Sequence, residues 1–191
     1  MSHEALAALS CVVKDDHLHI ATGNTQLLQA DLGDENGVAA VEAFFSSYIN
    51  EHMPGHLHGM PKVVRLDTKA FTDTYAPWIT LGGSASIEAY ATATNTYPDA
   101  RRFRLNMMVK TDDAFSETSL IGKDIMIGAA QLRIVAPVGR CAAIDVDPAT
   151  AKRGKDTLSI MREKFGHTDL GVFAEIISPG TIRTDDSITV L

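Results

Sequence analysis

Short strand-like segments separated by turn residues are the feature of this sequence that most limits its fold. Each segment alternates apolar and polar side chains or is apolar throughout, and Gly, Pro, Asn or Asp residues stand between them. Helical spacing of apolar residues occurs only at 38–52, 84–95 and 156–166. Because about eight strands and these helices do not alternate regularly, the pattern predicts a mostly β, α+β fold with a strongly curved, barrel-like core and attached helices.

The order of the expected elements follows from the turn signals. An N-terminal hairpin turns at Lys14, Asp15 and Asp16, Asn36 caps the first helix, and a second hairpin turns near Gly128 with Leu132 and Ile134 pointing inward. Gly166 ends the last helix, which buries Leu158, Met161 and Phe165. Strands are expected at 9–13, 17–22, 62–66, 76–81, 102–110, on both sides of Gly128 within 122–140, at 171–178 and at 186–191.

Composition narrows the class of protein. The chain has 191 residues, 45% of them hydrophobic, and a net charge of −7, which argues against a general nucleic-acid binder. No leader-like start and no long apolar run is evident, so we expect a cytoplasmic protein with no membrane span. We also expect an N-terminal extension over 1–39, a hairpin packed on the core, followed by one domain over 40–191.

The two cysteines differ in their neighbours. Cys141 directly follows Arg140, and Arg133 lies on the segment leading to it. A nearby guanidinium favours thiolate over thiol, and the thiolate is both nucleophile and metal ligand. The alternative, a small hydrophobic residue in the core, stays open on local chemistry alone. Cys11 lies in the apolar stretch ALSCVV without a basic neighbour, so we expect it to be a packing residue.

A second group of candidates is the stretch RRFRLN at 101–106. On the expected strand, Arg104 and Asn106 share one side, while Phe103, Leu105, Met107 and Val109 share the other. Arg supplies a planar donor fork for phosphate or carboxylate, and Asn supplies both a donor and an acceptor. The alternative is a solvated outer face.

Two further motifs carry weaker signals. His52, His56 and His58 could ligate a metal, although Pro54 breaks the helical spacing, and an incidental loop is the simpler interpretation. The glycine pair in TLGGSAS, at 80–86, could cradle an anion at a helix start, but it lacks the lysine of a P-loop.

Taken together, these pieces resemble the MOSC domain, which occurs at the C-terminus of molybdenum cofactor sulfurases and in the mitochondrial amidoxime-reducing component. The features that carry the resemblance follow one another in the family's order: FTDTYAPWITLGGSASIEAYA, RFRLNMMV, IGAAQLRIVAP, GRC, VDPAT and the ending GVFAEIISPGTIRTDDSITVL. Leu105 stands where the family usually has proline, and Ile144 where it usually has threonine.

The resemblance implies a cleft that binds the molybdenum cofactor, a pterin dithiolene that carries a phosphate. Cys141 would be the catalytic residue, as the thiolate ligand of molybdenum or as a sulfur carrier. The cofactor-binding residues would be Arg104, Asn106, Arg140, Ser86 and Asp145.

Three functions are therefore expected to compete. The first is a molybdenum-dependent oxidoreductase that reduces N-hydroxylated compounds with electrons from a separate redox protein. The second is a sulfur carrier with a Cys141 persulfide, formed by a partner cysteine desulfurase that holds pyridoxal phosphate. The third is a non-catalytic binding protein that uses its histidine-rich loop.

Overall fold

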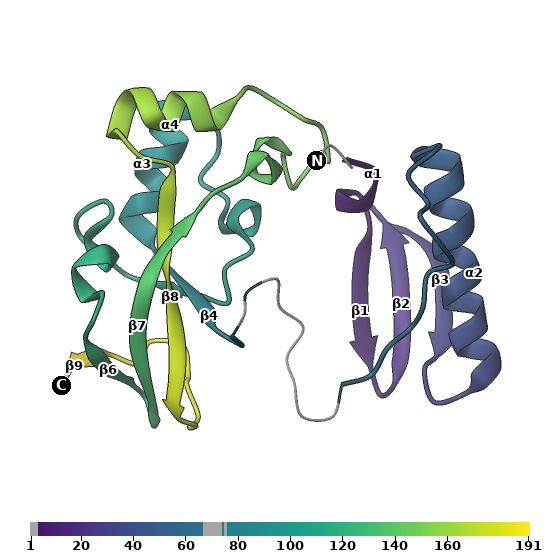
Figure 1. Cartoon of the computed structure of the whole chain (residues 1–191), viewed down its shortest axis with the longest axis horizontal. Helices are drawn as coiled ribbons and strands as arrows, with labels where there is room; N and C mark the ends of the chain where they lie inside the picture. Colours follow the sequence, from purple (N-terminus) through teal and green to yellow (C-terminus); the bar gives the residue numbers. More distant parts are fainter. Residues whose placement is uncertain (1–3, 67–73, 75) are drawn as a thin grey trace. The chain divides into compact units, whose positions relative to one another are not determined.

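The computed structural model describes residues 4–66, 74 and 76–191, and it divides into two compact units. The first unit contains Met1–Asp67 and Val146–Arg153, and the second contains Thr68–Asp145 and Gly154–Leu191. Each unit has its own sheet (Figure 1). The division therefore assigns residues 40–67 to the N-terminal unit, whereas the sequence analysis grouped them with the second domain.

The first unit is a three-stranded antiparallel sheet with a long helix. Its strands lie in the order β1-β2-β3, and helix α2 packs against β3. The hairpin turn contains Asp15 and Asp16, whose φ angles of 50° and 60° suit a tight turn. The bounds of the elements are α1 Glu4–Ala7, β1 Ser10–Lys14, β2 His17–Thr22, β3 Thr25–Asp31 and α2 Glu35–His52.

Three features of this unit differ from the sequence analysis. Asn36 is not the cap of α2, because the carboxylate of Asp34 accepts from Gly37 N (3.2 Å) at the helix start. Strand β3 was not expected. Residues 62–66 form no strand, since the backbone N–H of Val63 donates to the side chain of Glu42 (3.1 Å) instead of to a neighbouring strand.

The second unit is a curled six-stranded sheet in the order β5-β4-β8-β7-β6-β9, in which only β4 and β5 run parallel. Figure 1 shows β7 and β8 as the long central pair, with α3 and α4 near one end of them. The elements are β4 Ile79–Gly83, α3 Ser84–Thr94, η1 Ala100–Phe103, β5 Met107–Val109, η2 Ser116–Leu120, β6 Asp124–Ile127, β7 Ala130–Gly139, η3 Ala142–Asp145, α4 Thr157–Phe165, β8 Asp169–Ser178 and β9 Ile188–Val190.

Two apolar clusters stabilise this unit. One lies on the sheet and includes Leu132 and Ile134, which are buried as predicted. The other joins the helices to the ends of the strands and consists of Ile87, Tyr90, Phe103, Ile144, Met161 and Leu170, with Leu158 and Phe165 packed against it. Gly166 ends α4 in the left-handed conformation, as expected. The mixed α+β prediction is confirmed.

The long strand expected over 102–110 is wrong. Residues up to Phe103 form the 3₁₀ helix η1, which begins where the carboxylate of Asp99 accepts from Arg101 N (3.0 Å). Arg104 then adopts a left-handed conformation with φ of 50°, and strand β5 begins only at Met107. Arg104 and Asn106 therefore do not share a strand face.

The FTD part of the expected motif, at 71–73, lies outside the described residues. Within the residues that the structure describes, no helix is both long enough and apolar enough to cross a bilayer.

Candidate functional site

Cys141 lies in an exposed turn directly after β7. The backbone N–H of Arg140 donates to the carbonyl oxygen of Thr168 (3.0 Å), so pairing with the β8 side continues one residue beyond the strand. On the other side, Ile144 N donates to the carbonyl oxygen of Cys141 (3.2 Å) and closes the first turn of η3. The thiol is therefore exposed on a backbone that is fixed on both sides, and the alternative of a buried core cysteine is excluded.

Arg140 fastens this turn to two other segments. Its Nε donates to the carbonyl oxygen of Leu170 (2.8 Å), as does Nη2, and its Nη1 donates to that of Phe103 (2.8 Å). The guanidinium also lies 5.5 Å from the centre of the Phe103 ring. Burial lowers the pKa of Arg140 to about 10, while attraction to Cys141, Glu117 and Asp169 acts in the opposite direction.

Arg104 and Asn106 lie just after η1, which Arg140 connects to the Cys141 turn. Because Arg140 holds the carbonyl of Phe103, the residue just before Arg104, the Cys141 turn and the Arg104 turn are tied together. The exposed Arg104 guanidinium forms no hydrogen bond or ion pair with any residue that the structure describes. Asn106 is also exposed, and its Oδ1 accepts from Thr80 N (2.9 Å) and Oγ1 (3.0 Å), while its NH₂ group forms no hydrogen bond with the described residues.

Ser86 is enclosed. It is 0% exposed, its hydroxyl donates to Glu117 Oε2 (2.7 Å), and it accepts from Phe115 N (2.7 Å). Glu117 is 2% exposed and also accepts from Gly171 N (3.2 Å) through Oε1. The sequence analysis missed Glu117, because nothing near it in AFSETSL indicates that Ser86 and Gly171 contact it.

Asp145 is also turned inward. It is 7% exposed, and its Oδ1 accepts from the backbone N–H (3.0 Å) and the hydroxyl (2.6 Å) of Thr157, the first residue of α4. Like Ser86, it has a hydrogen-bonding role within the unit. Neither residue is part of the binding set proposed below.

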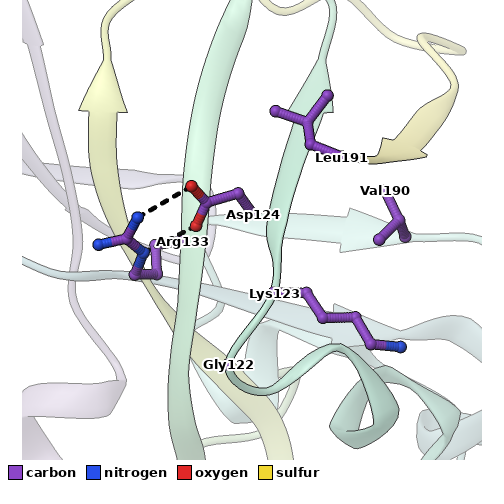
Figure 2. A pocket seen from close by; sticks show the side chains of 6 residues that line it. All are labelled: Gly122, Lys123, Asp124, Arg133, Val190 and Leu191. Atoms are coloured by element: carbon purple, nitrogen blue, oxygen red, sulfur yellow. Dashed lines mark hydrogen bonds and ion pairs between the residues drawn. The ribbon is translucent and has the colours of Figure 1, made fainter.

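Arg133, expected to support the thiolate, is paired elsewhere. Figure 2 shows its guanidinium against the carboxylate of Asp124, with Nε–Oδ1 and Nη2–Oδ2 distances of 2.7 and 2.9 Å. This pairing lowers the pKa of Asp124. Both residues line an open hollow of about 700 Å³ together with Gly122, Lys123, Val190 and Leu191. Apart from Arg133, none of the predicted site residues lines this hollow.

The histidine-rich loop belongs to the first unit. The ring of His52 packs on Tyr48, with 4.3 Å between ring centres, and its Nε2 is 4.0 Å from Glu51. Among the residues that the structure describes, no group of three His, Cys, Asp or Glu side chains is arranged to hold a metal ion.

Comparison with known proteins adds to this geometry. The MOSC domain family matches residues 79–189. The molybdenum cofactor sulfurase of Drosophila pseudoobscura pseudoobscura is 32% identical over 89 residues, which is 46% of this chain and 11% of that protein. The molybdenum cofactor sulfurase of Drosophila erecta is 35% identical over 81 residues, 42% of this chain and 10% of that protein. The matched part thus spans about a tenth of these relatives.

A crystal structure of a hypothetical protein is also similar, with a TM-score of 0.44 and 16% identity over 62% of this chain and 54% of that one. The matched range 79–189 contains Arg104, Asn106, Arg140 and Cys141 and is more than half of the 191 residues. This chain therefore belongs to the MOSC domain family.

Proposed function

We propose that this chain binds the molybdenum cofactor at the turn after β7, with Cys141 as the thiolate ligand of the metal. The observation that carries this proposal is that Arg140 ties together two turns, one with the exposed thiol of Cys141 and the other with the exposed guanidinium of Arg104, which pairs with none of the described residues. The similarity to molybdenum cofactor sulfurases supports the choice of cofactor.

The donor groups at this turn suit the parts of the cofactor. A soft thiolate is a suitable ligand for the metal. The guanidinium of Arg104, which pairs with none of the residues that the structure describes, can form charge-assisted hydrogen bonds with a phosphate, and the NH₂ group of Asn106 can donate to an acceptor of the pterin. Arg140 uses its donors on main-chain carbonyls, so in this proposal it positions the turn and does not contact the cofactor.

The activity we propose is reduction of N-hydroxylated compounds with electrons from a separate redox protein. When bound, the molybdenum cofactor supplies two-electron redox chemistry at the metal. The contribution of this chain is to hold the metal through Cys141 and the pterin phosphate through Arg104, on a backbone that Arg140 keeps fixed.

A second candidate is a sulfur carrier, and the name of the curated relatives favours it. In this scheme the Cys141 thiolate attacks the outer sulfur of a persulfide on a partner cysteine desulfurase. A Cys141–sulfur bond forms, the sulfur–sulfur bond of the donor breaks, and the desulfurase cysteine leaves as thiolate. Pyridoxal phosphate would belong to that partner.

The test of cofactor binding is the molybdenum content of protein made in a host that synthesises the cofactor. We expect near-stoichiometric metal in the wild type, almost none in Cys141→Ala, and wild-type content in Cys11→Ala, which removes the other exposed thiol. Arg104→Gln should lower the content at least severalfold, because the phosphate loses a charged donor. Equal molybdenum in wild type and Cys141→Ala would reject the ligand role of the thiol.

Mass spectrometry separates the two candidates. The carrier predicts a mass increase of one sulfur on the Cys141 peptide after incubation with a cysteine desulfurase and cysteine, and no increase on the Cys11 peptide. The oxidoreductase predicts reduction of an N-hydroxylated substrate that is lost in Cys141→Ser. A persulfide without molybdenum binding or reductase activity would favour the carrier.

A further inference from the structure

We propose that Leu105 is a positioning residue for the two residues that flank it in the chain, Arg104 and Asn106. Its side chain occupies a glycine seat, formed by Gly82 and Gly171 on the neighbouring strands β4 and β8. This contact fixes the backbone from which the two flanking side chains extend. The inference rests on the proposed function in one respect, that these two residues bind the cofactor.

The glycine pair Gly82-Gly83 ends β4, and both of its residues are buried. They therefore face neighbouring side chains of the protein, and each leaves room for one of them. A Cβ atom on Gly83 would lie 2.6 Å from Oε2 of Glu117, and a Cβ atom on Gly82 would overlap Cδ1 of Leu105. Glycine is required where another group approaches the backbone this closely. The first glycine of the pair thus accommodates Leu105.

Gly171 completes the seat from β8. The antiparallel register of β4 and β8 pairs Leu81 with Val172, and continuing it by one residue brings Gly82 opposite Gly171. A Cβ atom on Gly171 would lie 3.2 Å from Cδ2 of Leu105. Its φ of +83° is also in the left-handed region that favours glycine. Two opposite positions without side chains therefore leave room for the two methyl groups of Leu105.

The chain is also held by polar contacts on both sides of Leu105. On one side, Nη1 of Arg140 donates to the carbonyl oxygen of Phe103 (2.8 Å). On the other side, Asn106 N donates to the carbonyl oxygen of Thr80 (3.1 Å), and Thr80 N donates to Oδ1 of Asn106 (2.9 Å). Leu105, which is half-buried, supplies the apolar contact between these two polar ones.

The backbone of Arg104 shows what these contacts achieve. Its φ and ψ angles of 50° and 43° are left-handed, which is unfavourable for a residue with a side chain. Such a conformation persists only where the surrounding structure over-determines it. The exposed guanidinium pairs with none of the described residues, so it does not hold the turn itself. The direction in which Arg104 leaves the turn therefore depends on its backbone, which the adjoining Leu105 anchors.

The test is a double-mutant cycle in the full chain, followed by amide hydrogen exchange at Asn106, whose N–H is released when the turn opens. Gly82→Ala adds a methyl group that overlaps Leu105, Leu105→Val shortens that side chain by one carbon, and the double variant conserves the total volume. We expect exchange at Asn106 to be about fivefold faster in each single variant and within about twofold of the wild type in the double variant.

Gly139→Ala is the matched control, because its added methyl group would meet only Oδ1 of Asp169, at 3.6 Å. It should leave the exchange at Asn106 unchanged. Additive effects of the two single variants would overturn the proposal, since Gly82 and Leu105 would then act independently. If Gly82→Ala alone does not fold, the double variant decides: recovery of the fold supports the glycine seat, and no recovery overturns it.

The molybdenum content of the same variants, made in a host that synthesises the cofactor, connects the seat to the proposed function. Each single variant should contain severalfold less metal than the wild type, because a displaced Arg104 loses hydrogen bonds to the phosphate, and the double variant should recover it. Equal content in all variants of a molybdenum-containing wild type would overturn the positioning role. If the wild type itself contains no molybdenum, the proposed function fails, while the exchange at Asn106 still decides whether Leu105 positions the turn.

Discussion

The two cysteines are both exposed, yet they lie in regions of very different construction. Cys11 is on β1, an edge strand that pairs only with β2 and whose five residues are all exposed. Cys141 follows β7, which is paired on both sides, and its turn is fastened by the partly buried hydrogen bonds of Arg140. The expectation that Cys11 is a packing residue is wrong, so exposure does not distinguish the two thiols.

The residues around the two thiols distinguish Cys11 from Cys141. At Cys11, loss of hydration next to the rest of the protein raises the pKa of the thiol, although the residue is exposed, and this keeps the thiol protonated at neutral pH. Cys141 directly follows Arg140, whose guanidinium is fixed by hydrogen bonds to the carbonyl oxygens of Leu170 and Phe103. Cys141 therefore follows a fixed cation in the chain, whereas Cys11 lies between Ser10 and Val12, and a nearby cation favours the thiolate form of a cysteine.

The largest effect should come from removing the anchor of the Cys141 turn. We expect Arg140→Gln to lower the free energy of unfolding by about 3 kcal/mol, because it removes three hydrogen-bond donors from the main-chain carbonyl groups of Leu170 and Phe103. Trp78, the single tryptophan, packs against Phe173 with ring centres 5.6 Å apart, so its fluorescence in urea reports on the second unit.

The matched change in the other region is Lys14→Gln, at the exposed end of β1. It should alter the Trp78 transition by less than about 0.5 kcal/mol. If both variants unfold at the same urea concentration as the wild type, Arg140 does not stabilise the Cys141 turn. The surroundings of Cys141 and Cys11 would then not differ in stability.

A second prediction concerns the reactivity of the thiols. In single-cysteine variants at pH 7.5, iodoacetamide should alkylate Cys141 about tenfold faster than Cys11. The sign follows from the charges: the raised pKa of Cys11 leaves less thiolate at this pH, so its rate should keep increasing with pH into the more alkaline range. In denaturant the two rates should become similar, and equal rates in the folded protein would contradict the prediction.

Sequence patterns predicted those parts of the molecule that local interactions determine. Both expected hairpins and the three longer helices were found, because turn and end signals such as Gly128 and Gly166 are encoded within a few residues, whereas α1 and the 3₁₀ helices were not predicted. The strand expected over 102–110 failed because alternation around Arg104 imitates a strand, while the carboxylate of Asp99 starts a 3₁₀ helix there. Local polar contacts override periodicity in such short segments.

The same difference between local and long-range interactions decides which residues of the candidate site could be predicted. Cys141 and Arg104 could be found because the residue types indicate their chemistry. Glu117 could not be found, since its partners Ser86 and Gly171 are 31 and 54 residues away in the chain and only the folded sheet brings them together. The same long-range contacts explain why Ser86, expected to contact the cofactor, has an enclosed hydroxyl.

The smallest effect is expected at the other end of β7, where Arg133 pairs with Asp124 across β6 and β7. Because this charge is already neutralised by a carboxylate, Arg133→Gln should leave the alkylation rate of Cys141 unchanged. Asp124→Asn should lower the melting temperature at pH 7 by about one to two degrees, as is usual for an exposed ion pair.

The pH dependence of that difference checks its origin. Hydrogen bonding to Arg133 lowers the pKa of Asp124, so the pair stabilises the fold above the ordinary aspartate value of about 4 and loses its effect as the pH falls below it. Wild type and Asp124→Asn should therefore melt together in acid. A slower Cys141 reaction in Arg133→Gln would instead mean that the positive charge of Arg133 acts on the thiol from the far end of β7. Among the described residues, Arg140 would then not be the only cation that distinguishes Cys141 from Cys11.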